Sequence, residues 1–364
     1  MKFCVWNLIL VVGLMFGGMN TFAQENVRAK NASNWELSGR VQLQYLNNTD
    51  TESDASRTTN GFRIRRGRLQ TKANLNSFVS AKFQIEVRDN SPRLKDAEAK
   101  IKLFKSAYVK FGQFKVPVWR EEFMRSSGKL LLVERSEAAE FLADNLLSAR
   151  HVGLEFGSKV GDKVHFAVNF SNGAGEGIRE DAGRSKSDAV NNGKMLVGRV
   201  DVDATKNVKI GISGAANNLG NEIGDADNTG AVTVIAPDFG VYLDSGFDIE
   251  GGIAFGNVSK DLLGVEDAHD RGFTVFDVTG RWKKKLDKKS ENLGGLDAFE
   301  LAAGFGRVDP DTDVDNDEES FFRFGPAVYF GSKTRLQLNG EIEMPSADGA
   351  DSVFKIRSQL TVNL

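Results

Sequence analysis

The sequence predicts an all-β protein whose strands close into a transmembrane antiparallel β-barrel of about 16 strands. Three observations lead to this fold class. Apolar and polar residues alternate with a period of two through most of the chain. The connections between the alternating segments are short and long in turn, and the first residues have the pattern of an export signal.

Alternation is clearest in three segments. From residue 78 to 89, apolar and polar side chains take turns, as in Phe83-Gln84-Ile85-Glu86, and segments 36–46 and 353–364 repeat the pattern. Successive side chains of a strand point to opposite faces, so this period gives one apolar and one polar face. Strands of about ten residues also match a tilted crossing of the hydrocarbon layer of a membrane.

The same pattern predicts sixteen strands. An even number returns both ends of the barrel to the same side, and closure leaves no open edge. Short turns on one side and long polar loops on the other are typical of outer-membrane barrels, although the turn at 284–296 is longer than this rule predicts. The expected strands lie near 35–46, 61–75, 78–89, 95–104, 106–115, 150–158, 162–171, 194–203, 207–216, 237–244, 247–256, 272–283, 296–308, 320–330, 332–344 and 353–364. The expected long loops are 47–60, 116–149, 172–193, 217–236, 257–271 and 309–319.

A soluble all-β sandwich or propeller is the alternative fold. Its strands would usually have about five or six residues, and its buried face would hold few charges. In this chain the polar face is dense in Lys, Arg and Glu, while the other face consists of Val, Leu, Ile, Phe and Ala. A charged inner face and an apolar outer face fit a water-filled lumen surrounded by lipid.

The N-terminus predicts a signal peptide at 1–23 and a barrel domain at 24–364. Met1-Lys2 gives a short positive start, an apolar run follows, and Thr21-Phe22-Ala23 suits signal-peptidase cleavage. The run is short for a transmembrane helix, which leaves an N-terminal membrane anchor as the weaker alternative. The only cysteine, Cys4, lies in this segment, so the mature chain would cross an oxidising compartment without thiol chemistry. We therefore expect localisation in the outer membrane of a Gram-negative bacterium, among its lipid and lipopolysaccharide.

Several blocks of residues resemble a known family of outer-membrane proteins. The strand signature FRIRRGRL at 62–69 and the segment VKFGQFKVP at 109–117 are the most specific. Further matches follow in the family's order: ERS at 134–136, RHVGL at 150–154, FSNGAG at 170–175, VGRV at 197–200 and FELAA…RVD within 299–309. In these blocks the chain is similar to the phosphate-selective porin O and P family. The resemblance implies a sixteen-stranded, commonly trimeric porin whose third loop folds inward to narrow the pore.

Basic residues are concentrated in the first third of the chain. Between residues 61 and 125, Lys and Arg number 16 against 6 Asp and Glu, whereas between 217 and 352 they number 12 against 27. Cations in a narrow aqueous passage concentrate anions and repel cations. We therefore expect a passive channel that prefers anions. Guanidinium forks suit phosphate oxygens, so inorganic phosphate or other small anions are the expected solutes, and no cofactor is expected.

Strand parity indicates which cations line the pore. Arg or Lys at the lipid midplane costs about 2–4 kcal/mol, so the lumen is the favourable place for them. Phe62 and Ile64 break the parity of their strand, which predicts a bulge near Arg66-Gly67 that turns the preceding arginines inward. The expected pore-lining, anion-binding residues are Arg63, Arg65, Arg68, Lys72, Lys82, Arg88, Lys100, Lys102 and Lys110.

A second functional hypothesis assigns these cations a structural role. They would pair with Glu86, Glu98 and other lumen carboxylates and only hydrate the wall. The acidic second half of the chain would then line the opposite wall, and the resulting transverse field would admit solutes of either sign. The protein would in that case be a general diffusion porin for small polar solutes.

Residues 116–149 form the expected constriction loop. Long loops without regular structure are usually functional, and segment 130–142 (LLLVERSEAAEFL) predicts a short helix with an apolar side that packs on the inner wall. The alternative is a surface loop with self-paired charges. Four cations would edge the pore, opposed by Glu121, Glu122, Glu134 and Glu137. They are Arg120, Arg125, Lys129 and Arg135.

The acidic segment 309–319 (DPDTDVDNDEE) raises a calcium hypothesis. Its alternating aspartates resemble the opening of an EF-hand loop, but Val314 occupies the position that requires glycine. We therefore predict no metal site and interpret the segment as a solvated outer loop, or one that recruits divalent ions loosely beside lipopolysaccharide.

An enzyme is the remaining alternative, and we predict that the protein is not one. The chain has three histidines, His151, His165 and His269, and no G-x-S-x-G motif that would expose a nucleophilic serine. The spacing of the first two across a hairpin is only weakly suggestive of metal ligands. The basic stretch 283–289 lies in an expected turn, so nucleic-acid binding is not expected. A barrel hydrolase remains the minor enzymatic alternative.

Overall fold

The computed structural model describes residues 33–48, 60–88, 91–104, 106–176, 193–220, 222–223, 226–227, 229–262 and 269–364. The signal peptide expected at 1–23 and most of the loops expected at 47–60 and 172–193 lie outside the described residues. No helix within the described part of the chain is long and apolar enough to cross a membrane.

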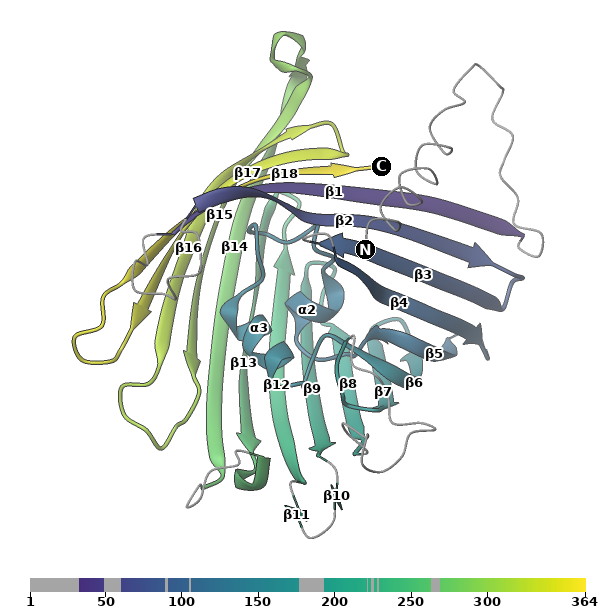
Figure 1. Cartoon of the computed structure of the whole chain (residues 1–364). Helices are drawn as coiled ribbons and strands as arrows, with labels where there is room; N and C mark the ends of the chain where they lie inside the picture. Colours follow the sequence, from purple (N-terminus) through teal and green to yellow (C-terminus); the bar gives the residue numbers. More distant parts are fainter. Residues whose placement is uncertain are drawn as a thin grey trace, which may run out of the picture.

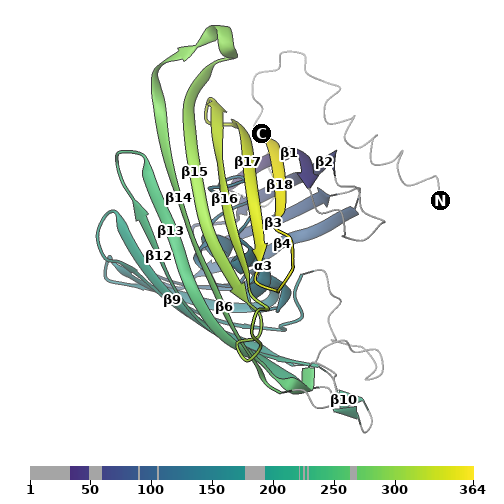
Figure 2. The same cartoon turned by 90° about the vertical axis from the view of Figure 1, so that its left-hand side faces the viewer.

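Sixteen strands of the described residues close into one antiparallel barrel, in which each strand pairs with its sequence neighbours and the first pairs with the last (Figures 1 and 2). The first eight strands are β1 (Asn34–Asn48), β2 (Asn60–Asn74), β3 (Val79–Arg88), β4 (Ser91–Lys102), β5 (Ala107–Lys115), β6 (Arg150–Val160), β7 (Val164–Ser171) and β8 (Met195–Asp203). The others are β9 (Val208–Leu219), β12 (Gly230–Tyr242), β13 (Phe247–Val258), β14 (Arg271–Ser290), β15 (Leu296–Asp309), β16 (Glu319–Phe330), β17 (Thr334–Pro345) and β18 (Val353–Asn363). The short strands β10 (Glu222–Ile223) and β11 (Ala226–Asp227) pair with each other after β9, and the 3-10 turns are η2 (Lys260–Leu262) and η3 (Glu291–Leu293).

The predicted strand number and order are confirmed, and the strand bounds differ most from the prediction at β12 and β14. β12 begins at Gly230, whereas the sequence predicted a loop as far as 236. The reason is that Val232 and Val234 are buried inside the barrel, so the inner face is apolar here and the expected alternation is lost. β14 extends to Ser290, through the lysine-rich stretch that the sequence placed in a turn. The β14–β15 hairpin therefore rises beyond the neighbouring turns (Figure 2), which explains the long connection.

The two faces of the barrel differ in chemistry as the alternation predicted. On β3 the side chain of Phe83 is exposed on the outer face, whereas Glu86 is buried on the inner face. Exposed apolar residues recur on the outer face of nearly every strand, for example Leu154 on β6 and Leu336 on β17. An apolar outer surface around a charged interior is the arrangement of a barrel in lipid.

The bulge predicted in β2 is present, one residue earlier than expected. The pairing of β1 with β2 shifts between Gln42, opposite Arg66, and Leu43, opposite Ile64. Arg65 is therefore the extra residue, and both Arg65 and Arg66 are buried inside the barrel. A bulge that leaves one residue without a partner lets two consecutive side chains share a face.

The loop between β5 and β6 folds into the barrel and carries two helices, α2 (Arg120–Met124) and α3 (Glu137–Asp144), which the strands surround in Figure 1. We call residues 116–149 the constriction loop. The helix is shorter than segment 130–142 predicted, because Ser136 caps it by accepting a hydrogen bond from the Ala139 amide. Residues 131–134, which precede this cap, form bends.

An apolar cluster fixes α3 to one side of the barrel interior. Ala139 and Leu142 of α3 are completely buried against inward-facing residues of β8, β9 and β12 to β16, which include Val197 and Phe273. This cluster fills the interior on that side, so the predicted packing of the loop on the inner wall is confirmed. The remaining space lies toward β1 to β6 and the last strands.

Candidate functional site

A carboxylate clamp attaches the constriction loop to β2. Glu134 accepts hydrogen bonds from Arg65, at 2.6 and 3.0 Å, from Arg66 at 3.1 Å, and from the Gln44 amide at 2.9 Å. The bulge makes this possible because it points both arginines at the same carboxylate. Burial alone would raise the pKa of Glu134, but the two guanidinium groups outweigh it and hold the pKa well below its usual range.

Ion pairs attach the opposite side of the loop to β8, β12 and β13. Arg120 is buried, and its guanidinium donates to Asp238 at 2.8 Å and to Asp201 at 3.1 Å. Arg199 of β8 binds the same two aspartates, which completes a four-residue network, and Arg125 pairs with a carboxylate of β13. Buried charges are tolerated only when paired in this way.

Hydrogen bonds to the loop backbone supply a third attachment. Arg335 of β17 donates to the carbonyl oxygens of Leu130 and Leu131 at 2.7 and 2.9 Å, and the Val133 amide donates to Asn339 at 2.6 Å. Near this point a Cβ atom at Gly128 would lie 2.4 Å from the Arg40 guanidinium, so a larger residue would require the Arg40 side chain to shift. The loop is thus held across the whole lumen.

The backbone of the loop is strained where it enters and leaves. Trp119, Leu146 and Ala149 have φ angles of 61°, 58° and 63°, in the left-handed region that non-glycine residues seldom adopt. Each such residue costs about 1–3 kcal/mol and persists only when its surroundings fix it, as the three attachments do here. Strain of this kind concentrates at functional sites.

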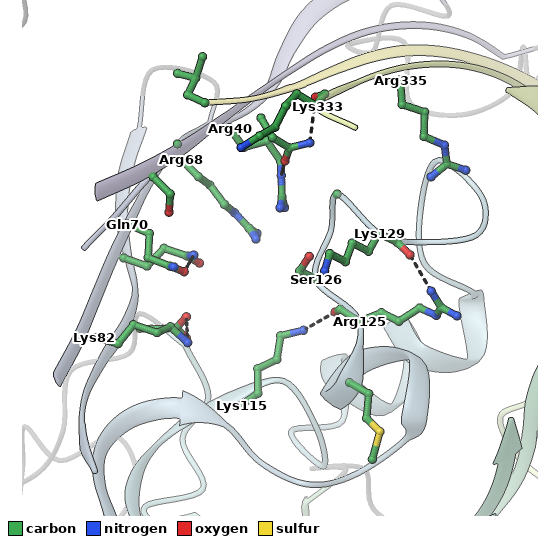
Figure 3. A pocket seen from close by; sticks show the side chains of 18 of the residues that line it. Arg40, Arg68, Gln70, Lys82, Lys115, Arg125, Ser126, Lys129, Lys333 and Arg335 are labelled. Atoms are coloured by element: carbon green, nitrogen blue, oxygen red, sulfur yellow. Dashed lines mark hydrogen bonds and ion pairs between the residues drawn. The ribbon is translucent and has the colours of Figure 1, made fainter. Parts of the chain in front are cut away.

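A cavity of about 840 Å³ lies between the constriction loop and the barrel end that carries the short turns (Figure 3). Of the described residues that line it, twelve are Lys or Arg and two are acidic. In Figure 3, Arg68 and Lys82 point into the space from one wall, and Lys129 of the loop points into it from the other. The basic residues are Arg40, Arg68, Lys82, Lys110, Lys115, Arg125, Lys129, Arg150, Arg281, Lys283, Lys333 and Arg335, and the acidic ones are Asp96 and Glu98.

Five of the predicted site residues line this cavity: Arg68, Lys82, Lys110, Arg125 and Lys129. The others lie elsewhere on the inner face. Arg65 is held by the clamp, and Arg63 donates to Gln44 at 2.8 Å. Lys100 lies 3.6 Å above the centre of the Tyr108 ring. The register places Lys72 and Lys102 nearer the short turns and Arg88 near the long loops.

Two residues predicted at the pore edge are not there. Arg120 and Arg135 do not line the cavity. Arg120 is an anchor of the loop to the barrel wall, and Arg135 pairs with Glu122 and donates to the carbonyl of Glu121, within the loop itself. The sequence prediction failed because the cations of a loop inside the barrel can pair with carboxylates of the barrel wall as well as with those of the loop itself.

The sequence analysis did not predict seven of the cations that line the cavity, and no single sequence pattern identifies all of them. Arg40 lay on the polar face of the predicted first strand, so parity alone would have found it. Lys115 and Arg150 flank the loop, while the other four come from the acidic second half of the chain, where charge counting obscured them. These four are Arg281, Lys283, Lys333 and Arg335.

Among the described residues around this cavity, the acidic second half forms no opposing acidic wall of the kind that the second hypothesis expected. All four charged residues that it contributes to the cavity lining are basic. Most of its inward carboxylates among the described residues are paired with arginines or lysines, as Glu300 is with Arg335 and Asp277 with Arg323. Most of the remaining acidic residues lie in the loops and turns, for example in 309–319.

Ion pairing within the cavity lining is extensive but incomplete. Eight of the twelve cations contact a carboxylate, as Lys82 does with Asp96 at 2.9 Å. The other four form no ion pair with a carboxylate in the part of the chain that the structure describes, although Lys283 lies 3.2 Å above the Tyr329 ring centre. These four are Arg40, Lys129, Lys283 and Lys333. We call them the unpaired cations.

Comparison with known proteins places the chain in a family. The family model described as phosphate-selective porin O and P matches residues 36–231, which is more than half of the chain. The chain belongs to this porin family. It is therefore an outer-membrane diffusion channel of a Gram-negative bacterium. No match was found among curated proteins.

Solved structures of other proteins share the fold of this porin at low sequence identity. The anion-selective porin from Comamonas acidovorans has a TM-score of 0.64 and 11% identity, and the alignment covers 91% of this chain and 99% of that one. The outer membrane channel DcaP of Acinetobacter baumannii has a TM-score of 0.62 and 12% identity, with 93% and 99% covered. OprB of Pseudomonas putida has a TM-score of 0.62 and 11% identity, with 91% and 94% covered.

Proposed function

We propose that this porin is a passive channel that prefers anions, with inorganic phosphate or other small anions among its solutes. One observation carries the proposal: twelve basic side chains and two acidic ones line the cavity below the constriction loop, among the described residues. Fixed positive charge in a narrow aqueous passage with low-dielectric walls raises the local anion concentration. The four unpaired cations supply the uncompensated part of that charge.

The side chains that line the cavity have the chemistry that binds phosphate. The cavity offers guanidinium groups, which match two phosphate oxygens at once, beside lysine ammonium groups. Arg40 is the best placed of the arginines, because its present acceptors are the neutral side chains of Asn363 and Ser127. Phosphate could therefore take the place of these acceptors without displacing a carboxylate. The solved anion-selective porin of the same fold supports an anion preference in general.

A general diffusion porin is the second candidate, and a specific observation favours it. Because eight of the twelve lining cations contact carboxylates, much of their charge is neutralised locally. Weak anion preference with no phosphate block would agree with this second candidate.

The assembly and location of the chain belong to the same proposal. We propose cleavage of a signal peptide at residues 1–23, a homotrimer within outer-membrane lipid and lipopolysaccharide, and the short turns on the periplasmic side. A trimer form has been solved for an outer membrane protein of Vibrio cholerae with this fold, at a TM-score of 0.61. The resemblance of the sequence to a commonly trimeric family supports the same assembly.

We also propose that the protein is not an enzyme. The three histidines lie apart: His151 is buried and contacts the Ser148 carbonyl and the Gly175 amide, while His165 and His269 lie near opposite ends of the barrel. A serine triad needs a hydroxyl within hydrogen-bond distance of the imidazole, and the described contacts of these histidines include no serine hydroxyl. Ester hydrolysis by the purified barrel would contradict this proposal.

The reversal potential tests the proposed selectivity. We would reconstitute the purified porin in a planar bilayer, impose a KCl gradient and then add phosphate to one side. A reversal potential of anion-selective sign, with chloride current reduced by phosphate, is the expected result. Cation preference or no preference, together with no effect of phosphate, would refute the anion proposal and leave the general diffusion porin.

A further inference from the structure

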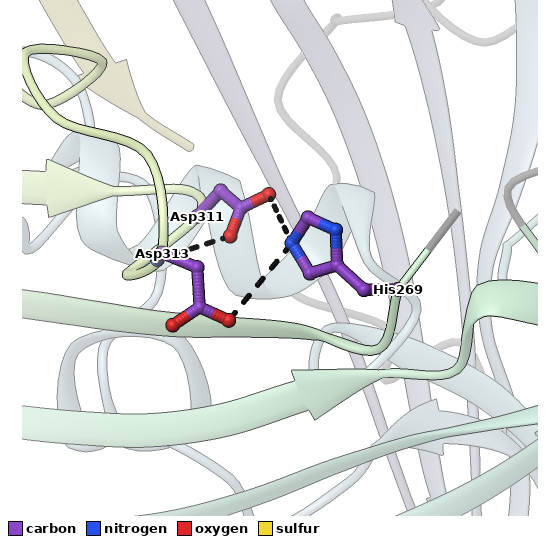
Figure 4. A group of neighbouring side chains, drawn as sticks. All are labelled: His269, Asp311 and Asp313. Carbon is purple, nitrogen blue, oxygen red and sulfur yellow. Dashed lines mark hydrogen bonds and ion pairs between the residues drawn. The ribbon is translucent and has the colours of Figure 1, made fainter. Parts of the chain in front are cut away.

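A histidine and two aspartates meet at the end of the barrel that carries the long loops. The His269 Nε2 atom lies 3.4 Å from Asp311 Oδ2 and 3.9 Å from Asp313 Oδ2, and Figure 4 shows the three side chains converging. One ligand atom from each residue lies within 4.8 Å of the others. His269 precedes β14, whereas both aspartates follow β15, so the residues come from two different loops.

Strand pairing explains why these loops meet. β14 and β15 are antiparallel neighbours, with Thr274 opposite Asp309, so the start of one strand lies beside the end of the other. Beyond the last pair, the Thr312 amide donates to the Gly272 carbonyl at 2.9 Å. The fold therefore fixes the backbones of both loops before any ligand binds.

We infer that His269, Asp311 and Asp313 form a binding site for one divalent transition-metal ion, with zinc as the best match. Zinc takes histidine nitrogen and carboxylate oxygen at about 2.0–2.2 Å, so the donor atoms of a tetrahedral site lie about 3.3 Å apart. The observed 3.4 and 3.9 Å separations are close to that value. Water would complete the coordination, because His269 and Asp313 are more than half exposed.

The donor set discriminates between metals. Calcium and magnesium are bound by oxygen atoms, so they gain nothing from an imidazole. Zinc, nickel and copper accept imidazole nitrogen readily. This inference differs from the calcium hypothesis that the sequence raised for 309–319, because the histidine lies 40 or more residues away and only the fold brings it there.

A second observation in the same loop points to a cation. The Oδ1 atoms of Asp309 and Asp317 are shielded from solvent and accept no hydrogen bond within the described part of the chain. Arg307 forms an ion pair with Glu318, and the same segment holds five aspartates between residues 309 and 317. A bound dication would relieve this crowding of negative charge.

A metal-free explanation competes with the inference. A protonated His269 would attract the two aspartates at the observed distances without any metal. Metal binding, in contrast, would join the loops before β14 and after β15 at the mouth of the barrel. It would also neutralise part of an acidic rim that repels anions.

Calorimetric titration of the whole porin distinguishes metal binding from the metal-free explanation. We would purify the protein without a histidine tag, in detergent, and titrate it with ZnCl2 and separately with CaCl2. The expected result is one zinc ion per chain, with an affinity at least tenfold above that for calcium. His269→Ala and Asp311→Asn should each lower zinc affinity at least tenfold.

His165→Ala is the matched control. His165 also contacts one carboxylate, with Nε2 lying 3.6 Å from Asp203 Oδ2, but it lies at the short-turn end of the barrel without a second acidic contact among the described residues. Its zinc affinity should equal that of the unmodified porin. Absence of zinc binding, equal affinity for calcium, or zinc binding that survives both His269→Ala and Asp311→Asn would overturn the inference. All three altered side chains are partly or largely exposed, so the variants should fold, which a heat-dependent gel shift would verify.

Discussion

Removing two of the four unpaired cations should halve the logarithm of the anion enrichment in the pore. We choose Lys129→Gln combined with Lys283→Gln, because neither lysine pairs with a carboxylate among the described residues and both line the cavity. Lys129 lies on the constriction loop and Lys283 on β14, so the double variant changes two sides of the passage. Replacing lysine with glutamine removes the charge and keeps a polar end on a side chain that is one atom shorter.

The size of the effect follows from the cavity. A sphere of about 840 Å³ has a radius of about 6 Å, which puts a wall charge about 7 Å from its centre. At that distance one charge contributes about 0.6 kcal/mol in water, and screening at 0.1 M salt leaves about half. Four unpaired cations then give about 1.2 kcal/mol, or about sevenfold anion enrichment, and two give about threefold.

Reversal potentials under a KCl gradient near 0.1 M measure this change. Lys284→Gln is the matched control, since Lys284 is the next residue of β14 but does not line the cavity. At 1 M salt the Debye length falls to about 3 Å, so the difference between the variants should nearly disappear. Unchanged selectivity in the double variant, or an equal loss in the control, would refute the assignment of selectivity to the unpaired cations.

Three further predictions concern the constriction loop and the wall. Glu134→Gln should weaken the anchoring of the loop by about 3–5 kcal/mol, because it leaves buried arginines unpaired. Hydrogen exchange in residues 116–149 should become faster. Exchange equal to that of the unmodified porin would contradict this prediction. Burial and a neighbouring carboxylate raise the pKa of Glu137 from about 4.5 to about 7, so the folded loop binds a proton that the unfolded chain has released, and loop stability should fall as pH rises from 4.5 to 7. Thermal unfolding against pH measures this fall, and Glu137→Gln should reduce it. A smaller fall should remain, because burial also raises the pKa of Glu140. Gly112→Ala should lower the free energy of unfolding by well over 1 kcal/mol, because Gly112 has φ of 113° and a Cβ atom would lie 2.0 Å from the Ala97 carbonyl oxygen. The folded fraction on gels should therefore drop. Gly198→Ala is the control and should fold normally, because the space around its Cβ position is open.

Strand alternation carried the fold prediction because it reports a local property. Each side chain of β3 faces lipid or lumen according to its own parity, so Phe83 and Glu86 were assigned without knowledge of their neighbours. The bulge in β2 was predictable for the same reason, since Phe62 and Ile64 had to remain on the outer face. Alternation failed at the start of β12, where the constriction loop makes the inner face apolar, and no local pattern reports a contact with residues about 100 positions away.

The candidate site was only partly predictable. Parity placed Arg68, Lys82 and Lys110 at the cavity, but it could not tell them from Arg65, whose charge the constriction loop neutralises through Glu134. Charge counts along the chain were misleading for the second half. Its carboxylates are either in loops or paired on the wall, while Lys333 and its basic neighbours reach the lumen.

The inward fold of the third loop was an expectation from the family resemblance. The sequence by itself determined the barrel, its strand number and the inner and outer faces. Those features depend on residue periodicity and on the spacing of turns, which are properties of short segments. Only the tertiary structure decided which charges remain unpaired, because ion pairing joins residues such as Arg120 and Asp238 that are far apart in sequence. It also brought His269 to the aspartates of a second loop, since antiparallel pairing of β14 and β15 aligns the ends of both strands.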